Sequence, residues 1–347
     1  MRLLLPFIDD STLFFAARVR SLLATTGHTV VTAHHSLETD YSGVTDRQIA
    51  TVLPKGPDIT TPSDFFRSSN PALSDYDAVV FCRPSRDLTA LGRDKSFLSR
   101  RERPRLVAYL GGLDFTPEKG MRNRAMFDAV FLNSDRDAQI YRSLKIGRRD
   151  QFIGWGHPYY VLSPRRSLGE NIYFFAQALS PATWASREFI CRVLKAIARG
   201  NPNRKVFLKL RHLPGENDRH KHKEVFAYPD IVGPDGPANL HMTACSMSEA
   251  IEDAGIAITC TSTAAMETIG AGIPTMIYLD YIERYRDPLT GPMAAEFAGS
   301  DLITDTTRLL QLRAREPNPT WLQTRFRSHA AFISELEAAI SQGRTPC

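Results

Sequence analysis

The sequence has few of the features that are typical of exported proteins, membrane-spanning proteins, or proteins stabilised by disulfides or structural zinc. Its five cysteines are an odd number without Cys-x-x-Cys spacing, so neither a disulfide framework nor a structural zinc site is indicated. The longest apolar runs, Leu3–Leu5 and Ile256–Cys260, have the length of buried strands rather than of a membrane helix. Asp9 and Asp10 stand where a secretory signal would need apolar residues. These absences favour a protein of the reducing cytoplasm.

Charge of one sign is in small excess only. Forty-three Lys and Arg against 38 Asp and Glu leave a net charge of +5, which is too mild to require nucleic acid as a partner. The balance suits anionic substrates or a peripheral contact with the inner face of a membrane. No Gly-x-Gly-x-x-Gly fingerprint follows the first predicted strand, which argues against a dinucleotide dehydrogenase. No cofactor is expected.

The chain has the length and composition of two globular domains. Its 347 residues, 43% of them hydrophobic, suffice for two cores of roughly 150 residues each. Short apolar strands alternate with amphipathic helices over 2–144 and again over 172–340. Such alternation predicts an α/β fold of two doubly wound, Rossmann-like domains with parallel sheets. Ligands of such sheets bind at the carboxyl ends of the strands, here expected in the crevice between the domains.

Glycine and proline mark the expected boundaries. Segment 156–169 predicts a linker between an N-terminal domain over 1–155 and a C-terminal domain over 170–320. A closing helix over about 321–340, within the terminal segment 321–347, is expected to pack back on the first domain. The polar stretch from His34 to Ser69 contains three prolines and receives no predicted structure.

The sharpest local signal is Thr259-Cys-Thr-Ser-Thr-Ala-Ala-Met-Glu-Thr-Ile-Gly-Ala-Gly-Ile-Pro274. A strand ends at Cys260, and Ser262 and Thr263 stand where the next helix begins, so the unpaired amides there offer an anion site. Glu267, one turn further on, can reach back toward the same ligand. The alternative interpretation is that Ser262 only caps the helix and Glu267 is a solvated surface residue.

A second strand runs into a loop dense in hydrogen-bond donors, Lys209-Leu-Arg-His-Leu-Pro-Gly-Glu-Asn-Asp-Arg-His-Lys-His-Lys-Glu224. Lys209, Arg211 and His212 fall at the carboxyl end of the strand, and an arginine binds phosphate oxygens in a fork. The loop therefore predicts the place where the charge of a departing phosphate is neutralised. For His220 and His222 a solvated loop face is the preferred interpretation.

These motifs resemble known sequence patterns. The Ser-Thr-x-x-x-Glu segment is similar to the nucleotide-sugar-binding stretch of GT-B glycosyltransferases and UDP-sugar 2-epimerases. Most of the chain resembles a bacterial family of polysialyltransferase-like glycosyltransferases. The resemblance rests on six C-terminal motifs in order, Phe175-Ala-Gln-Ala-Leu-Ser-Pro181, Lys209-Leu-Arg-His-Leu-Pro-Gly-Glu216, Tyr228-Pro-Asp230, Ser246-Met247, Ser262-Thr-Ala-Ala-Met-Glu267 and Gly272-Ile-Pro274, and more loosely on Asp10-Ser11 and 128–134.

The resemblance implies GT-B architecture and transfer of a sugar from a nucleotide-activated donor to a glycan or glycolipid acceptor. A CMP-activated sialic-acid-like sugar is one donor of this class, and inverting transfer in cell-surface polysaccharide or glycoconjugate synthesis is the implied role. The implied donor-binding residues are Lys209, Arg211, His212, Glu216, Ser246, Ser262, Thr263 and Glu267.

A transferase of this kind needs a base that takes a proton from the acceptor hydroxyl. Asp10 and Asp114 each follow a predicted strand of the N-terminal domain directly, and we favour Asp10 because Asp10-Ser11 matches the resembled family. The alternative is that Asp10 caps the first helix and Asp114 stabilises a turn.

No metal is expected to take part. His212, His220 and His222 are unevenly spaced in a polar loop without a nearby cysteine, which is a poor zinc pattern. The Asp-x-Asp pair that starts at Asp75 precedes a strand, and the pair that starts at Asp135 lies in the first turn of a helix, where acidic residues are ordinary.

A UDP-sugar 2-epimerase-like enzyme is the alternative function, because it shares the two domains and the Ser-Thr-x-x-x-Glu helix. An epimerase is expected to carry several carboxylates and histidines in its crevice, and this N-terminal domain supplies few. A two-lobed solute-binding protein is not favoured, since no export signal precedes the first strand.

Overall fold

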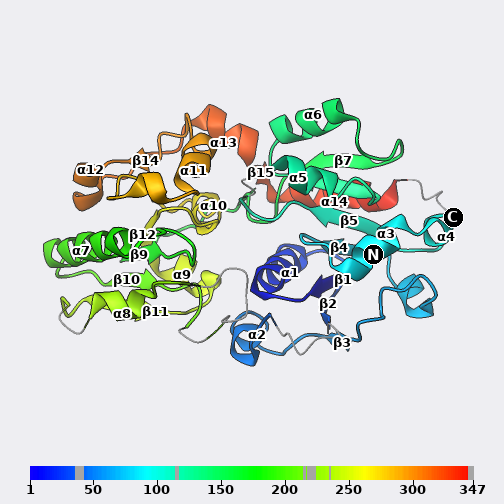
Figure 1. The fold of residues 1–347 in the computed structure, drawn as a ribbon, viewed down its shortest axis with the longest axis horizontal. Coiled ribbons are helices and arrows are strands. Elements are labelled where there is room, and N and C mark those ends of the chain that lie inside the picture. The colour runs from blue at the N-terminus through cyan, green and yellow to red at the C-terminus, as the bar shows by residue number, and fades with distance from the viewer. Residues whose placement is uncertain (36–42, 114–116, 214–215, 217–223, 234–235, 343–347) are drawn as a thin grey trace. The chain divides into compact units, whose positions relative to one another are not determined.

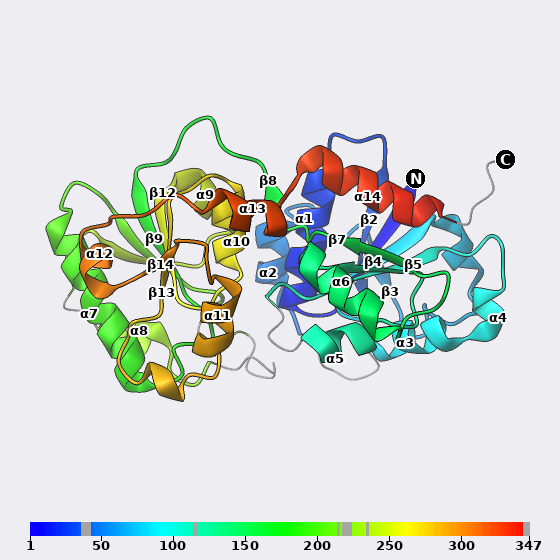
Figure 2. The same ribbon diagram turned by 90° about the horizontal axis from the view of Figure 1, so that it is seen from above.

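The computed structural model describes residues 1–35, 43–113, 117–213, 216, 224–233 and 236–342. It divides the chain into two compact units (Figures 1 and 2). Unit 1 comprises residues 1–161 and 324–347, and unit 2 comprises residues 162–323. Unit 2 is therefore an insertion in unit 1, and the backbone passes between the units twice.

Unit 1 contains a parallel sheet in the order β3-β2-β1-β4-β5-β6-β7. Its strands are β1 (Arg2–Phe7), β2 (Thr29–His35), β3 (Ile59–Thr61), β4 (Ala78–Phe81), β5 (Arg105–Tyr109), β6 (Ala129–Leu132) and β7 (Phe152–Trp155). Its helices are α1 (Asp10–Leu23), α2 (Asp46–Val52), η1 (Pro71–Asp75), α3 (Arg86–Arg93), α4 (Lys95–Leu98), α5 (Pro117–Arg122), α6 (Asp135–Leu144) and α14 (His329–Ser341).

Alternate residues of these strands point to opposite faces of the sheet and pack against different helices. Leu3, Leu5 and Phe7 share one core with α1 and α14. Leu4 belongs to the core on the other face, with α3 and α4, and Val130 lies on that same face under α5 and α6. Because both faces are covered, the central strands β1, β4, β5 and β6 are buried almost throughout, which is why they read as continuous apolar runs.

Unit 2 repeats this architecture with the order β11-β10-β9-β12-β13-β14. Its strands are β9 (Asn171–Phe175), β10 (Val206–Lys209), β11 (Leu240–Thr243), β12 (Ala254–Thr259), β13 (Thr275–Tyr278) and β14 (Ile303–Thr304). Its helices are α7 (Trp184–Gly200), α8 (Tyr228–Val232), α9 (Met247–Asp253), α10 (Ala264–Gly270), η2 (Arg284–Arg286), α11 (Thr290–Glu296), α12 (Thr306–Leu310) and α13 (Pro319–Arg325). In both units the strand order reverses beside the first strand, which is the topological switch point of a doubly wound sheet.

The prediction of one continuous closing helix over about 321–340 is wrong. The chain forms α13, then the short strand β15 (Arg327–Ser328), which pairs with β8 (Val161–Leu162), and only then α14. Arg327 donates its amide to the Tyr160 carbonyl at 3.0 Å, which interrupts the helix, and the Ser328 hydroxyl accepts the amide of Ala331 at 3.2 Å and begins the next one.

The helix α2 and the strand β3 lie between His34 and Ser69, a stretch for which the sequence predicts no structure. Thr45 caps α2, accepting the amide of Gln48 at 3.2 Å, while the Gln48 side chain accepts the amide of Thr45 at 2.8 Å. This is a reciprocal capping box. The strand β3 then extends the sheet by pairing with β2. Within the described part of the chain, no helix is long and apolar enough to cross a lipid bilayer.

Candidate functional site

All the predicted donor-site residues lie at or beyond the carboxyl ends of strands of unit 2, at one edge of its sheet. Lys209 ends β10 in register with Phe175 of β9, which is in turn in register with Thr259 of β12. Because β9 lies between the other two strands, the loops after β10 and β12 are separated by two strand spacings, about 10 Å. Lys209, Arg211, His212 and Glu216 belong to β10 and its loop, Ser246 follows β11, and Ser262, Thr263 and Glu267 follow β12. His220 and His222 lie outside the described residues.

Among the described residues of unit 2, the buried Tyr228 hydroxyl of α8 and two buried polar atoms directly after β10 and β12 have no hydrogen-bond partner. The latter two are Nε2 of His212, whose other ring nitrogen lies 3.3 Å from the Leu213 carbonyl, and Oγ1 of Thr261. Buried polar atoms are nearly always paired, and an unpaired one costs about 1–3 kcal/mol. His212 follows β10 and Thr261 follows β12, so the edge holds two polar groups that a ligand would satisfy. Thr261 was not among the predicted residues.

Three of the predicted side chains bind the local backbone in this structure. The Ser246 hydroxyl accepts the amide of Glu249 at 3.1 Å and so caps α9, and the Glu216 carboxylate accepts the amide of Leu213 at 2.7 Å. The Ser262 hydroxyl accepts the amide of Ala264 at 3.3 Å. Each of these contacts holds a loop at the strand ends in a fixed conformation.

Arg187, in the first turn of α7, joins two loops at the same edge. Its fully buried guanidinium donates to the carbonyl oxygens of Ala178 at 2.6 Å and Pro181 at 2.8 Å, in the loop after β9. It also donates to the Phe226 carbonyl at 2.7 Å and pairs with the Glu224 carboxylate, beyond β10. An arginine in an amphipathic helix is typical of a solvated face, so the sequence did not indicate this role.

The loop after β13 is attached to the same group of loops. The Ser180 hydroxyl donates to the Asp287 carboxylate at 2.6 Å, and the Ser186 hydroxyl donates to the Ile282 carbonyl at 2.6 Å. The loops that follow β9, β10 and β13 are therefore joined at the same end of the sheet as the loops that carry His212 and Thr261.

In unit 1, the switch point between β1 and β4 carries an ion pair. Asp9 caps α1 through Oδ1, which accepts the Thr12 amide at 2.9 Å, and its Oδ2 accepts an Arg83 N–H at 2.5 Å. Asp9, rather than Asp10, is thus the helix cap. Asp10 is fully buried at the first position of α1 and accepts the Ser11 hydroxyl at 3.2 Å. Asp114 lies outside the described residues.

His157 supports the neighbouring loop from inside unit 1. Its Nε2 lies 2.9 Å from the Leu110 carbonyl, and its Nδ1 lies 3.3 Å from the Tyr159 amide, which fits a neutral ring that donates from Nε2. Asn133 donates to the Gly112 carbonyl at 2.6 Å, while its own buried side-chain oxygen has no hydrogen-bond partner among the described residues. Burial lowers the pKa of His157 to about 3.

This lowered pKa predicts an acid-sensitive contribution to stability. His157 stays neutral in the folded protein but takes up a proton in the unfolded chain below about pH 6.5, so its contribution is present above that pH and lost as the pH falls toward 3. Between pH 7 and pH 5 the wild type should lose about 2 kcal/mol more unfolding free energy than His157→Gln. Urea unfolding of both proteins at the two pH values measures this difference, and equal losses would contradict the assignment.

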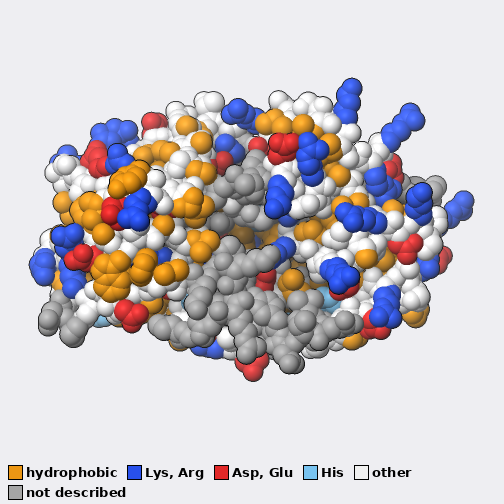
Figure 3. All heavy atoms as spheres, in the orientation of Figure 1, with side chains coloured by type: hydrophobic (Ala, Val, Ile, Leu, Met, Phe, Trp, Pro, Cys, Tyr) orange, Lys and Arg blue, Asp and Glu red, His pale blue; other side chains and the backbone are white. Residues whose placement is uncertain are grey.

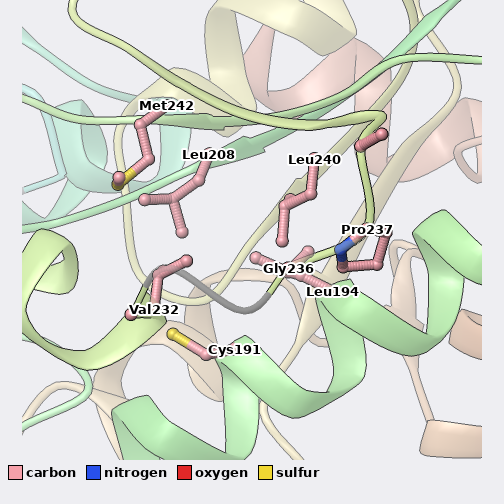
Figure 4. Close-up of a pocket in the computed structure, with 10 residues that line it drawn as sticks. Cys191, Leu194, Leu208, Val232, Gly236, Pro237, Leu240 and Met242 are labelled. Carbon is pink, nitrogen blue, oxygen red and sulfur yellow. The ribbon is translucent and has the colours of Figure 1, made fainter.

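No group of three or more His, Cys, Asp or Glu side chains among the described residues is arranged to hold a metal ion. A separate cavity of about 260 Å³ lies on the α7 face of β10 and β11 (Figure 4). Leu194, Leu208 and Leu240 line it together with Cys191, whose pKa burial raises to about 12, so this thiol stays protonated. None of the predicted donor-site residues contributes to this cavity.

Solved structures share this fold at low sequence identity. A putative UDP-N-acetylglucosamine 2-epimerase from Listeria monocytogenes matches with a TM-score of 0.57 and 12% identity, over 100% of this chain and 98% of that one. The UDP-GlcNAc 2-epimerase from Methanocaldococcus jannaschii matches with a TM-score of 0.56 and 10% identity, over 97% and 99% of the two chains. The Neisseria meningitidis UDP-GlcNAc 2-epimerase, solved bound to UDP-GlcNAc, matches with a TM-score of 0.50 and 12% identity, over 100% of this chain and 95% of that one. No curated protein matches the sequence.

The two doubly wound units are of the GT-B class, as the sequence predicted. The chain belongs to the family described as "Putative glycosyltransferase (DUF6716)", whose model matches residues 9–341. The predicted resemblance to a glycosyltransferase family is thereby confirmed at the level of the family, and the polysialyltransferase-like specificity stays a prediction.

Proposed function

We propose that this protein is a glycosyltransferase that moves a sugar from a nucleotide-activated donor to a glycan or glycolipid acceptor. Membership of a glycosyltransferase family supports the reaction class, and the unpaired His212 and Thr261 at the strand ends of unit 2 support the place of the donor. The nucleotide phosphates would lie between the Arg211–His212 loop and the Ser262–Thr263 turn. The two unpaired atoms are the single observation that carries this placement.

The proposed reaction is an inverting displacement. The acceptor hydroxyl attacks the anomeric carbon, the nucleotide leaves with the bonding electrons, and a carboxylate of unit 1 takes the hydroxyl proton. Asp10 is the proposed base. Arg211 and Lys209 neutralise the charge on the leaving phosphate, so the reaction proceeds without a divalent metal and EDTA leaves the rate unchanged.

The proposed classes of donor and acceptor rest on the resemblance to polysialyltransferase-like glycosyltransferases. A CMP-activated sialic-acid-like sugar is the proposed donor, and the product belongs to a cell-surface polysaccharide or glycoconjugate made at the inner face of the membrane. Thermal unfolding with CMP, CDP, UDP and GDP tests the donor, because a ligand that binds only the folded state raises the melting temperature. A shift of several degrees with one nucleotide would identify the donor class, and no shift with any of them would overturn the proposal.

Arg211 should contribute strongly to nucleotide binding. A charge-assisted hydrogen bond contributes about 1.5–3 kcal/mol, so Arg211→Ala should weaken nucleotide affinity by about tenfold to a hundredfold. Isothermal titration measures the loss. Arg199→Ala, at an exposed position near the end of α7, serves as a control that should leave affinity unchanged. Equal affinities of wild type and Arg211→Ala would place the phosphates elsewhere.

An epimerase-like activity is the second candidate, favoured by the UDP-GlcNAc 2-epimerases among the structures that share the fold. Incubation with UDP-N-acetylglucosamine alone separates the two functions. An epimerase converts the sugar without an acceptor, whereas the proposed transferase leaves it unchanged.

A further inference from the structure

The net positive charge of the protein is concentrated in one part of unit 1. Unit 2 carries 18 basic and 18 acidic residues, so the whole excess of +5 belongs to unit 1. Within unit 1, residues 1–77 have six Lys and Arg against nine Asp and Glu, a charge of −3, and residues 78–161 have sixteen against nine, a charge of +7. The mild net charge of the sequence therefore conceals a strong internal asymmetry.

The fold places this positive segment on one side of the sheet. Residues 78–161 form β4 to β7 and the helices α3 to α6, which all cover the face opposite α1 and α14. In Figure 3, Lys and Arg side chains gather over the part of unit 1 in which Figure 1 draws α3 to α6. The positive charge is thus spread over a broad surface of four helices.

The densest part of this surface lies at the amino ends of β5, β6 and β7. We call it the basic rim, and it consists of six exposed side chains, Arg93, Lys95, Arg100, Arg101, Lys145 and Arg149. The acidic residues nearby are fewer. Asp94 caps α4, Asp150 pairs with Arg148 at 2.7 Å, and Glu102 and Asp75, which lies just before β4, are exposed. The rim therefore keeps an excess of positive charge.

A buried ion-pair cluster fixes the backbone beneath the rim. Asp128, which directly precedes β6, accepts two N–H groups of Arg103 at 2.6 and 2.7 Å and one of Arg148 at 3.3 Å. It also accepts the Leu106 amide at 2.8 Å, and Arg105 lies 3.9 Å away. One carboxylate thus holds three arginines in place, and the two segments that carry the rim are joined through it.

We propose that the basic rim docks unit 1 on an anionic lipid bilayer. A membrane surface fits because the rim is built from two separate segments, 93–101 and 145–149, rather than from the walls of one groove, and because a charged surface attracts basic residues within a Debye length. The proposal extends the membrane contact that belongs to the proposed function, but it rests on the charge and geometry of unit 1 alone. The rim lies at the amino ends of the strands, so docking leaves their carboxyl ends, with Asp9, Asp10 and Arg83, away from the lipid.

Vesicle binding of the full-length protein tests the proposal. The variant replaces Arg93, Lys95, Arg101 and Arg149 together by glutamine, because none of these side chains makes a hydrogen bond or ion pair among the described residues. The matched control replaces three arginines and one lysine at exposed positions of unit 2, Arg199, Lys205, Arg313 and Arg315, by glutamine. Both variants lose four positive charges, so a difference in vesicle binding between them reports where the charges lie and not how many are removed.

The wild type and the control should co-sediment with vesicles of phosphatidylcholine and phosphatidylglycerol, and should do so less as salt rises. The rim variant should bind these vesicles about fivefold more weakly for each removed charge that reaches the surface. Equal binding of the rim variant and the control, or binding to pure phosphatidylcholine, would overturn the proposal. Binding of the rim to an acidic polysaccharide or to RNA instead of vesicles would also overturn it.

The same proteins separate this result from the transferase reaction. Sugar transfer to a water-soluble acceptor should be the same in the rim variant and the wild type, since the rim is remote in the sheet from the proposed base. Loss of vesicle binding with intact transfer supports the docking surface. If no transfer is found with any donor, the proposed function fails while the vesicle measurement still decides the docking surface.

Discussion

Replacing Arg187 by Leu should lower the free energy of unfolding of unit 2 by about 3–5 kcal/mol, the cost of breaking a buried ion pair. Only 2% of the arginine side chain and 13% of its partner Glu224 are exposed, so water does not replace the lost contacts. The substitution leaves a buried carboxylate and the carbonyls of Ala178, Pro181 and Phe226 without their donor.

Urea unfolding of the two proteins measures this loss. Arg192→Leu, on an exposed turn of the same helix, is the matched control and should change stability by less than about 0.5 kcal/mol. The double variant Arg187→Leu/Glu224→Gln should recover part of the stability, because it removes the unpaired charge. Similar midpoints for Arg187→Leu and the control would show that Arg187 does not hold the loops together.

Changing Asp10 to Asn should reduce sugar transfer on the order of a hundredfold or more, the usual contribution of a general base. The substitution keeps the size of a fully buried side chain and removes its capacity to take a proton. Nucleotide affinity should not change, because the proposed donor site is in unit 2. Single-turnover rates and nucleotide titration together test both expectations.

Asp135→Asn is the matched control, since Asp135 also occupies the first position of a helix that follows a strand of the same sheet. It should retain wild-type transfer. Full activity of Asp10→Asn together with inactive Asp114→Asn would assign the base to Asp114. If both variants remain active, the base lies elsewhere in unit 1, and the His34–His35 pair would be tested next.

The sequence predicted the fold well because the two doubly wound sheets depend on buried strands, and such strands are visible as apolar runs. The sequence did not predict the elements whose ends are set by a few individual hydrogen bonds. The helix α2 has its own sequence signal, the Thr45-x-x-Gln48 capping box. The prolines that follow it favour irregular structure, so the sequence predicted no helix there. The break before α14 has only a weak local signal, the N-cap Ser328, because it depends on the contact between Arg327 and Tyr160, 167 residues apart in the chain.

The predicted site divides in the same way. Motif residues such as Arg211 and Ser262 were predicted because they follow strands in an α/β pattern; the fold places them at the carboxyl ends of β10 and β12, and their role in donor binding stays a prediction. Thr261 was missed because a hydroxyl without a partner is visible only when the burial of its oxygen is known. Arg187 and Asp128 were missed because their neighbours come from distant segments of the chain.

The insertion of unit 2 within unit 1 sets an order of events during synthesis. Phe332, Leu336, Ala339 and Ile340 of α14 belong to the same core as the first strand, although they leave the ribosome after the whole of unit 2. Residues 162–323 are complete before these side chains appear, so unit 2 can fold while unit 1 still exposes apolar surface. A premature stop before residue 329 would therefore leave a folded unit 2 attached to an unfinished unit 1, a product prone to aggregation and degradation.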